Sequence, residues 1–259
     1  MNALHIVLLL AAGLAAGTVN AIAGGGSLIT FPALVAAGLS TKAASVTNSL
    51  AVAPGYAASV YGSRHDLAEL AKTRGRGVIV ALVPTTIVGA AAGSVLLLAT
   101  PTKTFNYVVP FLVIGAAFVM AFQDRLRNVV GHPREMTPRR RAVALHSAVG
   151  LCSVYGGYFN AALGVILIAG IGLVLDESLA RVTALKNAVS MVIGVMTVLI
   201  YSIFGPVHWG DVALLAPATI VGGYLGARLA QRLPPRILRV VVVTLAFGVG
   251  IVLLVKAFA

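Results

Sequence analysis

The chain has 259 residues, of which 59% are hydrophobic and only 10% are charged, and its mean hydropathy is +0.99. Soluble domains contain about 25% charged residues, so this composition excludes a soluble globular domain and predicts a polytopic membrane protein. The net charge of +12 does not indicate nucleic-acid binding, because no soluble domain is expected that could present a basic face.

Long segments without Asp, Glu, Lys or Arg follow one another along the chain. They cover residues 1–41, 43–63, 77–102, 104–123, 142–175, 187–210, 212–227 and 240–255. Because a spanning helix needs about 20 apolar residues, most of these segments predict one span. Two of them, 1–41 and 142–175, are too long for one span and cramped for two. None contains a carboxylate, which excludes an intramembrane aspartyl protease.

In chain order, the first half comprises residues 1–124 and is expected to begin with a helical hairpin that glycines interrupt. The hairpin covers 4–38, and spans follow at about 42–62, 77–99 and 104–122. A basic cytoplasmic linker at 125–141 then leads to the second half, 142–259. That half has the same order, with a broken hairpin at 142–175 and spans at about 180–204, 211–230 and 236–257.

The two halves are related in sequence. The ten residues PTTIVGAAAG at 84–93 recur 133 residues later as PATIVGGYLG at 217–226. Internal duplication in an apolar chain is typical of secondary transporters, whose binding site lies where the halves meet. Both copies contain a Gly-xxx-Gly pair, which predicts close helix packing at Gly89 with Gly93 and at Gly222 with Gly226.

The basic residues predict the orientation of the spans. All fourteen arginines lie within 64–76, within 125–141, at 181 or within 228–239, which the positive-inside rule places in the cytoplasm. The chain then returns to the cytoplasm correctly only if 142–175 is a hairpin that enters and leaves the membrane on one side. The turn at 205–211, which contains no Lys or Arg, is then outside, and His208-Trp209 is expected to anchor it at the interface.

Applied to residues 1–41, the same reasoning places the N-terminus outside. Each half then has one hairpin and three spans, an odd number, so the second copy is predicted to be inverted. Sixteen Lys and Arg side chains are inside by this count, and three are outside: Lys42, Lys103 and Lys256. The expected fold is an all-α polytopic membrane protein with about eight transmembrane segments in two homologous inverted repeats.

A run of glycines interrupts the first hairpin. Gly24, Gly25 and Gly26 precede Ser27, and Asn20 lies four residues before the run. Consecutive glycines let the backbone turn and expose N–H groups, and a helix that starts near Ser27 points its positive end there. This pattern predicts a site for an anion or a polar headgroup, with a close-packing kink as the structural alternative. A nucleotide-binding P-loop is excluded because its lysine is missing.

The second hairpin has a corresponding break at Tyr155, Gly156, Gly157 and Asn160. It again combines glycines with polar side chains, so the two hairpin breaks together are expected to form one binding site.

Polar residues also begin the helix that follows each hairpin. They are Thr47 and Asn48 in the first half and Thr183, Lys186 and Asn187 in the second. Thr183 shares a helix face with Lys186 and Asn187, three and four residues on. Lys186 is the cation placed to meet an anion near the second hairpin, and a lysine that snorkels to the cytoplasmic interface is the alternative.

These residues resemble the sulfite exporter TauE/SafE family of membrane permeases over essentially the whole chain. The matching motifs are Asn20, GGGSLITFP at 24–32, Thr47-Asn48, YGGYF at 155–159, LKN at 185–187, GPVHW at 205–209 and GGYLGARLA at 222–230. The resemblance implies transport, usually export, of sulfite or small organosulfonates by a protein of seven or eight spans. Where the family commonly has Gly-Ala-Gly, this chain has Asn160-Ala161-Ala162, which is expected to stiffen the second hairpin and bears on the substrate.

The sequence therefore predicts a secondary transporter rather than an enzyme, located in the bacterial cytoplasmic membrane. Backbone N–H groups at the two glycine breaks are expected to hold a small sulfur-containing anion, with Asn20, Asn48 and Asn187 as orienting donors and Lys186 as the charge partner. A passive channel for a small anion or a neutral solute is the alternative. A sulfur-transfer role would require Cys152, the single cysteine.

Membrane lipid and the anion are the expected partners, and a homodimer is left open. No cofactor, metal ion or nucleic acid is expected.

Overall fold

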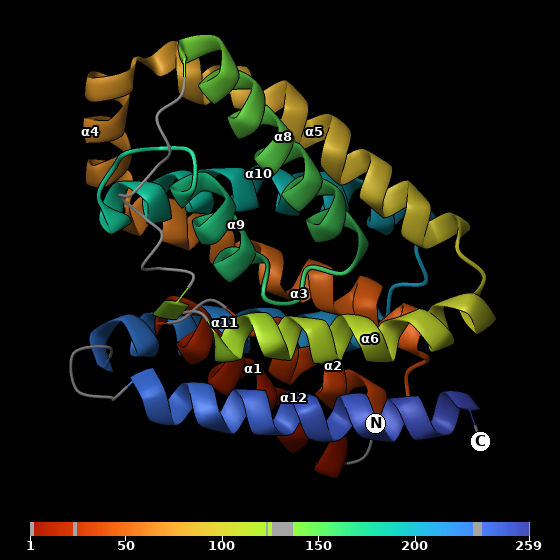
Figure 1. Ribbon diagram of the computed structural model, residues 1–259. Coiled ribbons are helices and arrows are strands. Elements are labelled where there is room, and N and C mark those ends of the chain that lie inside the picture. Colours follow the sequence, from red (N-terminus) through yellow and green to blue (C-terminus); the bar gives the residue numbers. More distant parts are fainter. Residues whose placement is uncertain (1–2, 23–24, 123, 126–136, 230–234, 259) are drawn as a thin grey trace.

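Figure 1 shows a computed structural model of the chain, in which residues 3–22, 25–122, 124–125, 137–229 and 235–258 are described. All regular secondary structure in these ranges is α-helical, as the sequence predicts. The first half contains α1 Ala3–Ile22, α2 Ser27–Ala36, α3 Thr41–Gly62, α4 Arg64–Arg74, α5 Arg76–Ala99 and α6 Thr102–Ala121. The second contains α8 Pro138–Tyr158, α9 Leu163–Gly172, α10 Leu179–Phe204, α11 Trp209–Leu229 and α12 Pro235–Phe258.

Two stretches differ from the expected boundaries. Helix α8 begins at Pro138, and the Thr137 hydroxyl accepts a hydrogen bond from the backbone N–H of Arg140. A capping Thr followed by Pro at the first helical position is a helix start, so the last residues of the expected linker belong to α8. Helix α4, which is charged and directly follows α3, has no counterpart among the expected spans.

Length and apolar composition allow four of the described helices to cross a membrane. These are α5, α6, α10 and residues 240–258 of α12. Shorter apolar helices occur in α1, α2, α9 and α11. The chain is thus an integral membrane protein, whereas the number of about eight spans and the inversion of the repeats stay predictions.

Each half contains a hairpin of a long helix and a short one. Helix α2 packs against α1 and α9 against α8, and the two short helices have 10 residues each. A helix of that length extends about 15 Å, half of the hydrocarbon thickness of a bilayer. Neither short helix can span the membrane alone.

The hairpins pack mainly against helices of the opposite half. Helix α1 lies along α11, and α8 lies along α5. A Cβ at position 93 would lie 2.0 Å from the carbonyl oxygen of Val154, and one at position 222 would lie 2.2 Å from that of Leu14. Close backbone approach of this kind requires glycine. The predicted packing is confirmed at Gly89, Gly93 and Gly222, and the surroundings of Gly226 lie outside the described residues.

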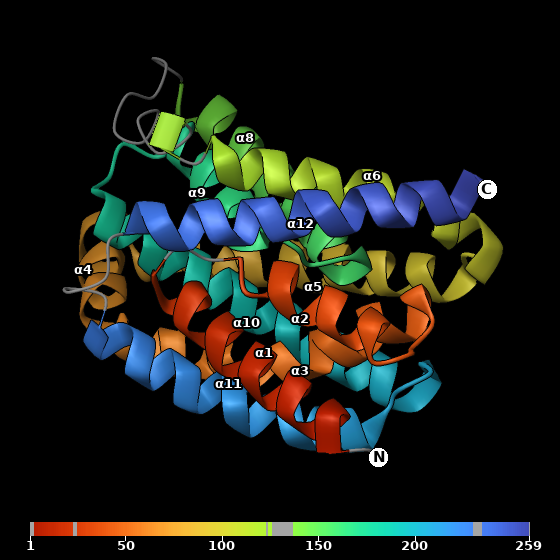
Figure 2. The ribbon, with the colours of Figure 1, turned by 90° about the horizontal axis from the view of Figure 1, so that it is seen from below.

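Contacts between helix ends divide the molecule into two sides. On one side, His5 of α1 bonds to Asp211 of α11, and the Lys42 ammonium of α3 donates to the Leu98 and Thr100 carbonyls after α5. Both termini lie at this end, opposite to α4 (Figure 2). These are the helix ends that the positive-inside rule places outside.

On the other side, the charged helix α4 reaches the turn between α9 and α10. The Arg74 Nε donates to Glu177 Oε1 at 2.6 Å, and an Arg181 nitrogen donates to Glu177 Oε2 at 2.9 Å. All three residues come from segments that the sequence predicts to be cytoplasmic. Although burial of Glu177 raises the pKa of its carboxyl, the hydrogen bonds from Arg74 and Arg181 hold that pKa below its ordinary value.

Candidate functional site

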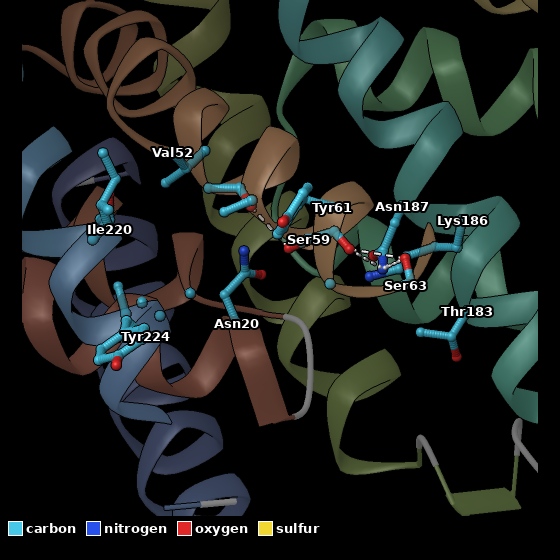
Figure 3. A pocket seen from close by; sticks show the side chains of 18 residues that line it. Asn20, Val52, Ser59, Tyr61, Ser63, Thr183, Lys186, Asn187, Ile220 and Tyr224 are labelled. Atoms are coloured by element: carbon cyan, nitrogen blue, oxygen red, sulfur yellow. Dashed lines mark hydrogen bonds between the residues drawn. The ribbon is translucent and has the colours of Figure 1, made fainter. Parts of the chain in front are cut away.

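A cavity of about 580 Å³ lies between helices of both halves (Figure 3). Helices α1, α3, α10 and α11 form its walls, and the break before α2 contributes Gly26. The lining residues are Ala16, Gly17, Asn20, Gly26, Val52, Gly55, Ala58, Ser59, Tyr61, Gly62, Ser63, Thr183, Lys186, Asn187, Thr219, Ile220, Gly223 and Tyr224.

Five of the residues predicted from the sequence meet at this cavity. They are Asn20, Gly26, Thr183, Lys186 and Asn187. In Figure 3 the α10 residues lie on one side, Ile220 and Tyr224 of α11 lie on the other, and Asn20 of α1 lies between them. The first hairpin and the start of α10 are thus brought together although more than 150 residues separate them.

The Asn187 side chain joins α10 to the end of α3. Its Nδ2 donates to the Ser59 carbonyl oxygen at 3.2 Å and to the Ser63 hydroxyl at 3.0 Å. Asn187 is almost fully buried, so these bonds fix the orientation of the amide. Its neighbour Lys186 is thereby held at the same wall.

The cavity lining is largely apolar, with a few polar groups and one basic side chain. Among the described residues that line it, Lys186 is the one with a basic side chain, and none is acidic. Hydroxyls and amides of Asn20, Ser59, Thr183 and others add hydrogen-bond donors. This set can hold a small anion, since an ammonium and neutral donors favour an anionic ligand.

The polar residues of α3 that the sequence singled out lie elsewhere. The Asn48 amide oxygen accepts a hydrogen bond from the Thr30 hydroxyl of α2, and both side chains are buried. The Thr47 hydroxyl oxygen accepts from the backbone N–H of His208 at 3.1 Å. Ser27, also buried, does not line the cavity. Asn48 and Thr47 thus tie α3 to α2 and to the turn before α11.

The second hairpin break is filled by its own contacts. The Tyr155 hydroxyl donates to the Ala161 carbonyl at 2.6 Å, and the Asn160 amide oxygen accepts from the Tyr56 hydroxyl at 3.0 Å. A Cβ at position 157 would lie 2.3 Å from the Ala90 carbonyl oxygen. None of these residues lines the cavity, so the structure does not bring the two breaks together there.

The remaining glycines of the two breaks make similar packing contacts. A Cβ at position 156 would meet the Leu163 side chain at 2.8 Å, and one at position 25 would meet the Met120 sulfur at 2.6 Å. Gly24 lies outside the described residues. Of the described glycines in the first run, Gly26 is therefore the one that lines the cavity.

Asn160 and Ala162 are the two described non-glycine residues with positive φ, at 66° and 54°. These are the positions at which the resembling family commonly has glycine. The left-handed conformation costs an L-residue about 1–2 kcal/mol, less for Asn than for Ala. The departure from Gly-Ala-Gly thus places a strained Ala at the tip of the second hairpin.

Buried residues separate the cavity from the outer ends of the helices. In α3, every residue from 43 to 52 is buried. Phe31 of α2 packs edge-on against Phe159 at the second hairpin tip, with ring centroids 5.3 Å apart. Phe105 of α6 contacts the same ring at 6.4 Å. Tyr61, beside the end of α3 that is predicted to be cytoplasmic, is 71% exposed. Buried side chains thus lie between the cavity and the helix ends that carry His5 and Asp211, whereas the exposed Tyr61 lies at the opposite end of the cavity.

Several cavity residues were not predicted from the sequence. Ser59, Tyr61 and Ser63 end α3 next to the basic stretch, and Thr219, Ile220 and Tyr224 lie inside the repeated motif of α11. The repeat itself was a usable signal, because a binding site is expected where the halves meet. Within the described residues, no group of three or more His, Cys, Asp or Glu side chains could hold a metal ion.

Comparisons with known proteins place the chain in a family. Residues 9–253 match the family described as Sulfite exporter TauE/SafE. The chain is 30% identical over 228 residues to the probable membrane transporter protein YfcA of Escherichia coli K12, covering 84% of this chain and 76% of the relative.

A probable membrane transporter protein, ORF9, of Sinorhizobium sp is 25% identical over 256 residues, which cover 97% of this chain and 94% of the relative. A probable membrane transporter protein of Haemophilus influenzae is 24% identical over 245 residues, which cover 93% and 91%. No solved structure matches the chain significantly. The match across nearly the whole chain, on an integral membrane fold of cross-packed helices, shows that this protein is a membrane transporter belonging to the TauE/SafE sulfite exporter family.

Proposed function

We propose that this transporter exports a small sulfur-containing anion, sulfite or an organosulfonate, across the bacterial cytoplasmic membrane by alternating access. The observation that carries the proposal is the cavity at which Lys186, Asn20 and Asn187 meet. A lining with one ammonium and no described carboxylate favours a small anion. The family description supports the choice of sulfite.

The asymmetry of the molecule supports a carrier rather than a channel. The cavity reaches the side of α4, whereas buried residues of α3 cover it on the opposite side. A protein with access from one side at a time is what alternating access requires. The close α1–α11 and α5–α8 pairs provide bodies that can rock against each other.

The test is uptake of radiolabelled sulfite into proteoliposomes, with sulfite, sulfoacetate, sulfate or thiosulfate on the opposite side. We expect saturable flux that one of these anions accelerates from the trans side. Flux that neither saturates nor shows counterflow would establish the passive channel instead. No flux with any of them would remove the sulfur assignment.

A matched pair of lysine variants connects the flux to the cavity. Lys186→Gln removes the cationic group of the lining, so the KM for the anion is expected to rise at least about tenfold. Lys72→Gln is the control, because Lys72 is exposed on α4 and pairs with Glu69 outside the cavity. Equal kinetics of both variants and the unmodified protein would exclude this cavity as the anion site.

A further inference from the structure

Asp211 stands apart from the other acidic residues of the chain. The remaining six, at 66, 69, 124, 135, 176 and 177, lie in segments that the sequence predicts to be cytoplasmic. Asp211 lies in the first turn of α11, at the predicted outer end, and is only 4% exposed. A carboxylate is favoured in the first turn of a helix, but burial within an apolar protein requires a partner.

Two histidines provide that partnership from different parts of the chain. His5 Nε2 of α1 lies 2.7 Å from Asp211 Oδ1, although 206 residues separate them. His208 Nδ1, in the turn before α11, lies 3.9 Å from Asp211 Oδ2. Histidine is the side chain whose charge ordinarily changes between pH 5 and 8. The three side chains thus form a cluster of two imidazoles around one carboxylate.

The cluster is linked to the barrier that closes the cavity toward the outside. The backbone N–H of His208 donates to the Thr47 hydroxyl of α3, within the buried stretch of that helix. In the same turn, a Cβ at position 205 would lie 2.9 Å from the Val46 side chain, so Gly205 packs closely against α3. The turn thus rests on α3, and a stronger attraction between His208 and Asp211 holds it there.

We propose that His5, Asp211 and His208 form a proton-binding site on the outer face, and that a proton bound there stabilises the conformation whose cavity is open to the cytoplasm. A proton from the outer solution converts an imidazole to an imidazolium, which pairs with the Asp211 carboxylate across 2.7 or 3.9 Å. The inference rests on the proposed alternating access at the cavity. It identifies the proton as the ion whose binding biases that alternation.

The other helices near this end of the molecule carry few charged groups. Helix α2, which packs on α1, contains no titratable side chain. On α3, the Lys42 ammonium donates to the carbonyls of Leu98 and Thr100 at 2.7 and 2.8 Å. Helix α12 carries Lys256 in its last turn, and α6 carries Lys103 in its first turn. Among the described ion pairs, those of Asp211 are with the two histidines, so proton binding at the cluster is governed by these three groups.

Cysteine accessibility measures the conformation without any substrate. Cys152, the single cysteine, is replaced by alanine, and Ala58→Cys is introduced in the cavity wall. In inside-out vesicles, a membrane-impermeant maleimide is added at constant pH to the cytoplasmic face, while the luminal pH is set between 5.5 and 8. We expect labelling to be about two- to fivefold faster at the acidic luminal pH, as for an ion pair of modest strength.

Substitutions in the cluster test whether it causes the dependence of labelling on luminal pH. Asp211→Asn and His208→Gln should each remove the dependence on luminal pH, and His5→Gln should reduce it. His65→Gln is the control, because His65 is exposed on α4 at the opposite end, and it should retain the dependence. If Asp211→Asn does not fold, the two histidine variants still carry the test.

Two results would overturn the proposal: labelling of the parent protein that is independent of luminal pH, or an unchanged dependence in the folded cluster variants. Because labelling needs no substrate, a failed sulfite flux with an intact pH response would reject the anion assignment and leave the proton site standing.

Discussion

Gly17 of α1 and Thr219 of α11 lie so close that a Cβ at position 17 would stand 2.2 Å from the Thr219 carbonyl oxygen. The Thr219 hydroxyl in turn lies 3.1 Å from the Ala51 carbonyl oxygen of α3 and donates to it. Both Gly17 and Thr219 line the cavity. The contact therefore joins the two halves of the chain at the wall of the candidate site, and its geometry depends on the absence of a side chain.

Adding one methyl group at this contact, or at the similar contact of Gly93 between α5 and α8, should disrupt the fold. Gly17→Ala and Gly93→Ala each place a Cβ within 2.2 Å of a backbone carbonyl oxygen, which a flexible side chain cannot relieve. We expect a loss of about 1–3 kcal/mol or of folded protein altogether. The controls are Gly115→Ala and Gly248→Ala, whose Cβ positions meet nothing within 4 Å. Thermal unfolding in detergent distinguishes them, and equal stability of all four variants would contradict the packing argument.

The tip of the second hairpin offers a stabilising substitution. Ala162 has a φ of 54°, so Ala162→Gly relieves left-handed strain and should raise the free energy of unfolding by up to about 1 kcal/mol after the greater flexibility of the unfolded chain is subtracted. Asn160→Gly also relieves a positive φ but loses the bond from Tyr56, and should not stabilise. The same gain at both positions would show that the Tyr56–Asn160 bond contributes nothing.

Glu177 should make stability depend on acid. Its carboxyl has a lowered pKa because, despite burial, Arg74 and Arg181 donate hydrogen bonds to it. A carboxyl whose pKa is lower in the folded state stabilises the protein above its unfolded pKa, and this stabilisation is lost as the pH falls through the folded value. Glu177→Gln should therefore cost about 1–3 kcal/mol at pH 7 and weaken the loss of stability below pH ~4.5.

The control for this prediction is Glu69→Gln. The pKa of Glu69 is also lowered, by a hydrogen bond from Lys72, but the pair is exposed on α4 and screened by solvent. Unfolding midpoints measured from pH 7 down to about pH 3 should shift little in this variant. A shift in Glu69→Gln as large as that in Glu177→Gln would assign the effect to net charge rather than to the hydrogen bonds that Arg74 and Arg181 donate to Glu177.

Cys152 should be dispensable for transport. It is 7% exposed within a cluster of apolar side chains of α8 and its neighbours, where it acts as a packing residue. We expect Cys152→Ala to retain saturable flux and the native thiol to resist an impermeant maleimide. A folded variant without flux would instead point to thiol chemistry and revive the sulfur-transfer alternative.

Much of the fold could be predicted from the sequence, because a bilayer restricts what an apolar chain can do. Charge-free segments of about 20 residues must become helices, and the segment expected at 180–204 is α10 Leu179–Phe204. The repeated Gly-xxx-Gly motif indicated close packing for a local reason as well, since only glycine allows backbones to touch. Helix α4 had no such signal, because its composition is that of an ordinary polar segment.

The candidate site could be predicted only in part. Asn20 and Lys186 were recognisable as polar groups in apolar surroundings, and they line one cavity. Asn48 and Gly157 had the same signal but are engaged by Thr30 and by the backbone of α5. A polar or glycine residue in a membrane helix serves either a ligand or a neighbouring helix, and spacing along one chain does not distinguish the two.

The sequence by itself determined the helical membrane class, the duplication and the family, because these depend on composition and local pattern. Only the tertiary structure decided that α1 pairs with α11, that Tyr61 and Tyr224 complete the cavity, and that His5 meets Asp211 across 206 residues. Such contacts depend on how the faces of separate helices fit together, which is a property of the packed molecule and not of any segment.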